Sequence, residues 1–233
     1  MMRRVLLAAI GTAASIVGTH AAEPVRHIGI YVQPYYESAQ ETGGTPRVAV
    51  GRSYDALLSS TKREDIIAAR DLIQRDPKRV TPMSMMVLAI RLYDVGLRDD
   101  AVFWFYAAKD RYIILADVVD VQAGGLAQAD DAVRSFSTLA GPFINGYAFC
   151  EIANQQAIRA KALEWVETNP YEVMFMERLP AKNPDRKAAL QRAIESAKAN
   201  AAKERAHFSD AANVAKFSAE RASNGMDEKF CWK

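Results

Sequence analysis

The sequence has few of the side chains on which most metal sites and acid–base sites depend. It contains two cysteines and three histidines, and only His27 and His207 lie beyond residue 22. No C-x-x-C or H-x-x-x-H spacing occurs, so no structural zinc site is expected. The local signatures of α/β-hydrolases, zinc proteases and P-loop nucleotide-binding proteins are absent as well. We therefore expect no metal, no cofactor and no catalytic residue that a linear motif identifies.

The chain also lacks an apolar run long enough to cross a membrane. The run Val5–Gly18 is shorter than the roughly 20 residues that a membrane-spanning helix needs. It follows two arginines and precedes small residues, which is typical of a secretory signal peptide. We expect residues 1–22 to be cleaved near Ala21 or Ala22, leaving a periplasmic or secreted protein with no stable membrane anchor. The alternative is a retained membrane anchor.

No excess of one charge sign remains after this cleavage. The whole chain has 30 Lys and Arg against 28 Asp and Glu, and Arg3 and Arg4 lie in the segment that is removed. Binding of nucleic acid through counterion release needs a basic surface. A nucleic acid partner is therefore not expected.

The two cysteines, Cys150 and Cys231, are predicted to pair. Paired thiols persist as disulfides in the oxidising compartment that an exported protein meets. Such a bridge would tie the C-terminus to the body of the protein, and the chain-entropy model gives it a stabilisation of about 4.5 kcal/mol at most. The alternative is two unpaired cysteines, one in the apolar stretch 144–152 and one on a frayed tail.

The pattern of apolar residues predicts a mainly α fold, with helical hairpins of repeat-like character and a short N-terminal β-hairpin. His27–Val32 alternates with period two, and Arg47–Val50 is a second short run, so these two segments are expected to form the hairpin. Thr61–Glu64 has the pattern of a capping box, and Thr81-Pro82 is expected to cap the next helix, with proline at its first position. Gly96 is expected to end that helix as a left-handed residue, and Gly141-Pro142 to break the chain. Helices are predicted over residues 61–75, 83–95, 99–115, 145–167, 184–206 and 209–222.

The helical hairpin at the centre carries a resemblance to a known family. The segment Leu92–Ala101 resembles the turn of a tetratricopeptide or Sel1-like repeat, together with the residues Trp104, Tyr106, Ala107 and Ala108 that follow it. The partial unit covers residues 82–116, and a weaker echo starts at Gly125. The resemblance implies a helical protein that binds peptides or proteins on a concave face.

The segment around Leu179–Pro184 is the clearest linker in the sequence. It divides the mature chain into residues 23–179, a helical domain with the N-terminal strands, and residues 180–233. We expect this last part to form a C-terminal helical pair that packs on the same core.

Four aromatic side chains are candidates for a partner surface. Trp104 and Tyr106 belong to a run of four consecutive aromatic residues, which must cover every side of a helix. Tyr35 and Tyr36 precede a turn-rich loop. Each pair either packs against the protein's own core or contacts a partner.

The leading functional hypothesis is an exported binding or adaptor protein that engages another protein or a peptide. An immunity-type inhibitor, which blocks an effector entering the periplasm, is one form of it. The alternative is an envelope hydrolase with a carboxylate-based site that has no linear signature. Two carboxylates facing one cleft, about 5 to 9 Å apart, would favour the hydrolase. A structural envelope protein without a specific ligand is a third possibility.

Overall fold

The fold is mainly α, as predicted. A computed structural model describes residues 23–41 and 43–231, and the predicted signal peptide lies outside the described residues. About 68% of the structure is helical, and a small antiparallel sheet lies near its N-terminal end. No helix in the described part of the chain is both long enough and apolar enough to cross a membrane.

The elements follow one another in the order strands, then helices. The strands are β1 (Tyr31–Val32), β2 (Tyr36–Glu37) and β3 (Arg47–Val48). The helices are α1 (Asp55–Leu58), α2 (Arg63–Arg75), α3 (Pro82–Asp94), α4 (Arg98–Val118), α5 (Ala127–Ala148), α6 (Ile152–Thr168), α7 (Arg186–Ser209), α8 (Ala211–Ser223) and α9 (Met226–Phe230). Short 3₁₀ turns are η1 (Pro77–Arg79), η2 (Gly124–Leu126) and η3 (Glu172–Phe175).

The sheet differs from the predicted hairpin. Its order is β1-β2-β3 with both pairs antiparallel, so the second of the predicted strands does not pair with the first. The middle strand is Tyr36–Glu37, at the start of the turn-rich loop, where no strand was predicted. A tight turn, in which Tyr35 N donates to Val32 O at 2.9 Å, brings this segment back onto β1 before the chain reaches residue 47.

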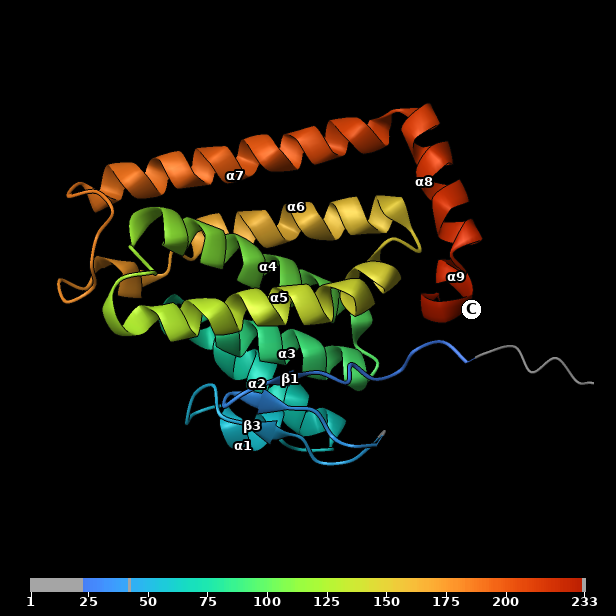
Figure 1. Cartoon of the computed structure of the whole chain (residues 1–233), viewed down its shortest axis with the longest axis horizontal. Helices are drawn as coiled ribbons and strands as arrows, with labels where there is room; N and C mark the ends of the chain where they lie inside the picture. Colours follow the sequence, from blue (N-terminus) through green and yellow to red (C-terminus); the bar gives the residue numbers. More distant parts are fainter. Residues whose placement is uncertain (1–22, 42, 232–233) are drawn as a thin grey trace, which may run out of the picture.

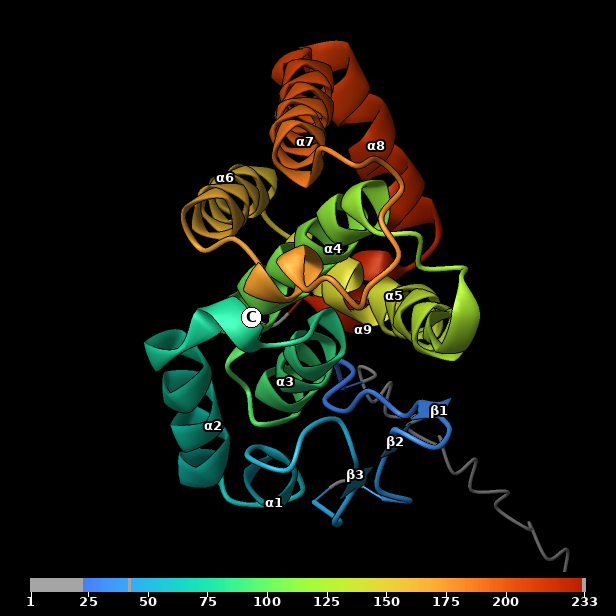
Figure 2. The same cartoon turned by 90° about the vertical axis from the view of Figure 1, so that its left-hand side faces the viewer.

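Helix α4 lies at the centre of the bundle, with α3, α5, α6 and α7 packed around it (Figure 2). Helix α3 is buried at every position from Pro82 to Tyr93, so it too is covered on all sides. The predicted antiparallel pairing of these two helices is present. Gly96, at φ +82°, supplies the left-handed residue that ends α3, and Leu97 N then donates to Leu92 O at 2.8 Å.

Two predictions about helix ends have opposite outcomes. The cap at the start of α3 is confirmed, because the Thr81 hydroxyl accepts from Ser84 N at 3.0 Å. The prediction of a capping box at Thr61–Glu64 is wrong, because the N-cap residue of α2 is Lys62 and no side chain caps the helix. The Ser60 hydroxyl accepts from Lys62 N at 3.1 Å instead.

The predicted break at Gly141-Pro142 is also wrong. Helix α5 continues through Pro142, and the chain turns later, between Ala148 and Ile152. Gly141 is buried, and a Cβ atom there would lie 3.7 Å from the Phe105 ring, so the helix packs closely against α4 at this point. Tertiary packing therefore outweighs the local cost of the proline.

Helix α7 lies on the side of the bundle opposite the sheet, and α8 leads from its end back to α9, which lies near the N-terminal segment (Figure 1). Helix α7 contacts α4 and α6 through a buried alanine-rich seam, whereas α8 buries a single residue, Arg221. The predicted pairing of Cys150 with Cys231 is confirmed, with a Cα–Cα distance of 5.5 Å. The bridge holds α9 against α5, where the Phe230 ring occupies the space that a Cβ atom on Gly146 would need.

Removing the disulfide tests how far the bridge stabilises this arrangement. The double variant Cys150→Ser, Cys231→Ser is expected to lose about 2–4 kcal/mol of unfolding free energy, because the denatured chain regains the freedom of an 81-residue loop. Urea unfolding followed by circular dichroism measures the loss. Dithiothreitol should lower the stability of the wild type and leave the double variant unchanged. Equal midpoints for the oxidised wild type and the variant would contradict the expectation.

Candidate functional site

Three of the four residues predicted to form a partner surface are buried. Tyr36 is 0% exposed, Trp104 is 1% exposed and Tyr106 is 6% exposed, so of the two alternatives these three side chains pack in the protein's own core and do not form a partner surface. The reason for Trp104 and Tyr106 is the position of α4, whose aromatic side chains meet neighbouring helices on several sides. The Trp104 ring, for example, packs edge-on against Trp165 of α6 at 5.1 Å between centroids. Tyr35 is half-buried and lines an apolar cavity.

Two sites lie on opposite faces of α4. Positions 106, 110 and 113 line one cavity, and positions 112, 115 and 119, which run on past the end of the helix, line another. At 3.6 residues per turn these two sets are on opposite sides of the helix. We call the first the polar cavity and the second the apolar cavity.

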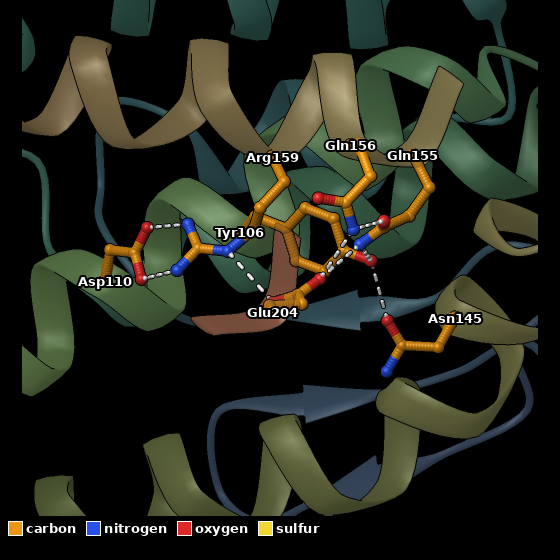
Figure 3. A network of polar contacts seen from close by, with 7 residues as sticks. All are labelled: Tyr106, Asp110, Asn145, Gln155, Gln156, Arg159 and Glu204. Carbon is orange, nitrogen blue, oxygen red and sulfur yellow. Dashed lines mark hydrogen bonds and ion pairs between the residues drawn. The ribbon is translucent and has the colours of Figure 1, made fainter. Parts of the chain in front are cut away.

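The polar cavity contains a network of seven side chains from four helices (Figure 3), which we call the polar cluster. The helix spacing places its members in pairs on one face, at i and i+4 on both α4 and α6. The members are Tyr106 and Asp110 of α4, Asn145 of α5, Gln155, Gln156 and Arg159 of α6, and Glu204 of α7.

An ion pair connects α4 to α6 within this cluster. Both terminal nitrogens of Arg159 donate to Asp110, Nη2 to Oδ1 at 2.9 Å and Nη1 to Oδ2. Arg159 Nε also lies 3.9 Å from Glu204 Oε2, so the guanidinium group stands between two carboxylates (Figure 3). Bidentate pairing of this kind fixes both partners in one geometry.

Amide groups complete the cluster. Gln155 Nε2 donates to the Tyr106 hydroxyl at 3.1 Å and to Glu204 Oε1 at 2.9 Å. The Tyr106 hydroxyl in turn donates to Asn145 Oδ1 at 3.0 Å. Gln156 Nε2 donates to Gln155 Oε1 at 2.7 Å. The cluster thereby joins α4, α5, α6 and α7 through hydrogen bonds.

Burial controls the protonation of the cluster. It raises the pKa of Asp110, although the Arg159 charge acts in the opposite direction. Burial also raises the pKa of Tyr106 to about 12, so this hydroxyl stays protonated at neutral pH. Asp110 and Glu204 both line the polar cavity, whose volume is about 290 Å³. One part of the condition for a carboxylate-based hydrolase, two carboxylates on one cavity, is therefore present.

The apolar cavity also has a volume of about 290 Å³. Its lining comes from the strand region, the start of α3, the end of α4, the start of α5 and the segment around η3. The lining residues are Tyr35, Ala49, Val50, Thr81, Pro82, Met83, Tyr112, Leu115, Val119, Val121, Leu126, Ala129, Asp130, Val133, Tyr171, Val173 and Leu179.

Among the described residues, Asp130 is the one charged residue in this lining. Its side chain is 0% exposed and accepts hydrogen bonds from the Tyr112 hydroxyl, from Gln122 Nε2 and from Arg134 Nε, the last at 2.9 Å. Burial, followed by the hydrogen bond to Asp130, raises the pKa of Tyr112 to about 12. The negative charge of Asp130 is therefore balanced by hydrogen bonds from neighbouring side chains, without a ligand.

A buried arginine fixes the wall beside η3. Arg111 donates to the backbone oxygens of Pro77 and Asn169, both at 2.7 Å, and to Val80 O at 3.0 Å. Its guanidinium group lies 5.6 Å from the centre of the Tyr171 ring. Desolvation lowers the pKa of Arg111 to about 10, which still leaves it charged at neutral pH. Arg111 thus holds the segments that position Tyr171.

Sequence analysis missed both sites. A usable signal was the occurrence of Asp110 and Arg111 in the middle of an otherwise apolar helix, because buried charges need partners. The partners come from distant parts of the chain, so no local pattern identifies them. The buried ion pair between Arg91 and Asp94 of α3 was missed as well, although the two residues stand at i and i+3 on one helix and a local pattern could have identified them. No group of three or more acidic, histidine or cysteine residues suited to a metal ion occurs within residues 23–41 and 43–231.

The ion pair in the polar cluster gives a direct stability test. Arg159→Ala leaves Asp110 buried without its partner and is expected to cost about 3 kcal/mol of unfolding free energy. The matched control is Lys198→Ala, which breaks the exposed ion pair with Glu167 between α7 and α6 and should cost less than about 1 kcal/mol. Chemical denaturation measures both. Equal losses in the two variants would contradict the structural role of Arg159.

Comparisons with known proteins find one relevant similarity. No family model matches the chain, and no solved structure matches it. An uncharacterised protein of Haemophilus influenzae is 36% identical over 210 residues, which cover 90% of this chain and 81% of that protein. At this identity and coverage the two sequences are homologous along nearly their whole length, and the chain belongs to the family of this Haemophilus influenzae protein.

Proposed function

We propose that this protein is an exported binding protein and that the apolar cavity is its binding site. The observation that carries the proposal is the cavity's composition. Its lining is almost wholly apolar, and its one carboxylate already accepts three hydrogen bonds. Small-molecule sites have this character, a mainly apolar concave surface with a few fixed polar groups.

The size of the cavity also supports binding of a small apolar group. Its volume of about 290 Å³ lies at the lower end of the range that small-molecule sites occupy. A partner protein, such as the effector that an immunity-type inhibitor blocks, would use the same cavity by inserting an apolar side chain.

The walls of the cavity are held in place before a ligand arrives. The Thr81 cap fixes the start of α3, and Arg111 fixes the backbone on either side of η1 and before η3. Preorganised walls lower the entropic cost of binding. The proposed site therefore needs no large rearrangement to accept its ligand.

A neutral fluorescent dye tests the proposal. N-phenyl-1-naphthylamine is expected to bind the purified protein with enhanced emission, and Ala129→Phe should weaken binding at least about tenfold because the new ring fills the cavity. The matched control is Ala219→Phe on the exposed surface of α8, which should leave the affinity unchanged. Circular dichroism checks that both variants fold. Equal affinity of Ala129→Phe and the wild type would refute the site.

A second candidate function is the envelope hydrolase, favoured by one observation. Asp110 and Glu204 line the same cavity, and burial raises the pKa of Asp110, as a general acid requires. Against it, Arg159 engages both oxygens of Asp110 and opposes its protonation. We therefore place this function second.

Incubation with purified peptidoglycan separates the two candidates. The binding proposal predicts that the protein releases no soluble fragments above the background that Glu204→Gln gives. Release by the wild type that is lost in Glu204→Gln, while dye binding is retained, would establish the hydrolase instead. Dye binding is the appropriate control because Glu204 does not line the apolar cavity.

A further inference from the structure

The charge of the apolar cavity restricts what it can bind. None of the described residues that line it is a lysine, arginine or histidine, and Asp130 contributes a negative charge to its wall. An anionic head group entering this space would lose its hydration and find no opposite charge on the lining. Burying an unpaired carboxylate is strongly unfavourable.

Three arginines that contact lining residues are already engaged with the protein itself. Arg134 is bonded to Asp130, and Arg111 donates to three backbone oxygens. Arg186 donates to the backbone oxygens of Met174, Met176 and Leu179 and so holds together the segment that follows η3. Pairing with an anionic ligand would require one of these arginines to give up backbone or carboxylate partners.

The cavity offers no partner to a cationic head group either. The side chain of Asp130 is fully buried and has three donors, so it offers an incoming amine no open approach. An amine would have to be desolvated without gaining a direct partner. The cavity therefore disfavours a charge of either sign.

Two hydroxyl groups remain for a neutral head group. Tyr171 is 6% exposed and lines the cavity, as does the half-buried Tyr35. Neither hydroxyl forms a hydrogen bond with the described residues, although a phenolic hydroxyl can both donate and accept one. Because no described residue bonds to either hydroxyl, both are available to donate to or accept from a ligand that enters the cavity.

These observations define a ligand class. Building on the proposed function, we propose that the apolar cavity binds a small, neutral, mainly apolar molecule with one hydroxyl, ester or amide group, which Tyr171 and Tyr35 recognise by hydrogen bonding. The apolar part contacts the aliphatic lining from α4 and α5. The absence of a lining cation excludes fatty acid anions of the same length.

Displacement of N-phenyl-1-naphthylamine by three molecules of equal chain length tests this selectivity. At neutral pH octan-1-ol is uncharged, octanoate is anionic and octylamine is cationic. Octan-1-ol is expected to displace the dye, and the two charged molecules should bind at least about tenfold more weakly. Displacement by octanoate at the same concentration as octan-1-ol would overturn the inference and leave the proposed function standing. Failure of the dye itself to bind would overturn both.

Tyrosine variants test the recognition of the head group. Tyr171→Phe and Tyr35→Phe should each weaken octan-1-ol binding about fivefold, through loss of a hydrogen bond, when each variant's affinity for octan-1-ol is compared with its own affinity for the dye. The matched control is Tyr31→Phe, since Tyr31 is 49% exposed and does not line the cavity. An unchanged affinity for octan-1-ol in the Tyr171→Phe, Tyr35→Phe double variant would overturn the role assigned to the two hydroxyls.

Discussion

The burial of the middle of α4, around Asp110 and Arg111, is the constraint on which the rest of the structure depends. This helix carries Asp110 and Arg111 in its interior, and a buried charge is tolerated only with partners. Asp110 meets Arg159 of α6, while Arg111 meets backbone oxygens before α3 and after α6. The two residues therefore fix neighbouring elements in specific positions, which apolar packing alone would specify less sharply.

The two faces of α4 have different roles as a result. On one face, the polar cluster joins α4 to α5, α6 and α7 through hydrogen bonds (Figure 3). On the other face, the side chains are largely aliphatic and leave a cavity between α3, α4 and α5. The cluster connects four helices, and under the proposed function the cavity on the other face accepts the ligand.

Much of the fold could be predicted from the sequence, because local signals marked it. The Thr81-Pro82 start of α3, the glycine after it and the two cysteines all acted as expected. Predictions failed where packing between distant residues decides the outcome. Helix α5 runs through Pro142, and β2 forms at Tyr36, since tertiary contacts outweigh local preferences there. The sequence could place Trp104 and Tyr106 on a helix, but it could not decide whether their side chains face the surface or the core. Three of the four candidate residues for a partner surface lie in the core.

The binding account depends on an apolar ligand entering one particular cavity, and a crystal soaked with 8-bromo-octan-1-ol tests this most directly. The account predicts an anomalous bromine peak inside the apolar cavity, among Leu115, Val133 and Val173, with the hydroxyl within hydrogen-bonding distance of Tyr171 or Tyr35. A bromine peak found only in the polar cavity or on the protein surface, at a concentration that saturates binding in solution, would contradict it.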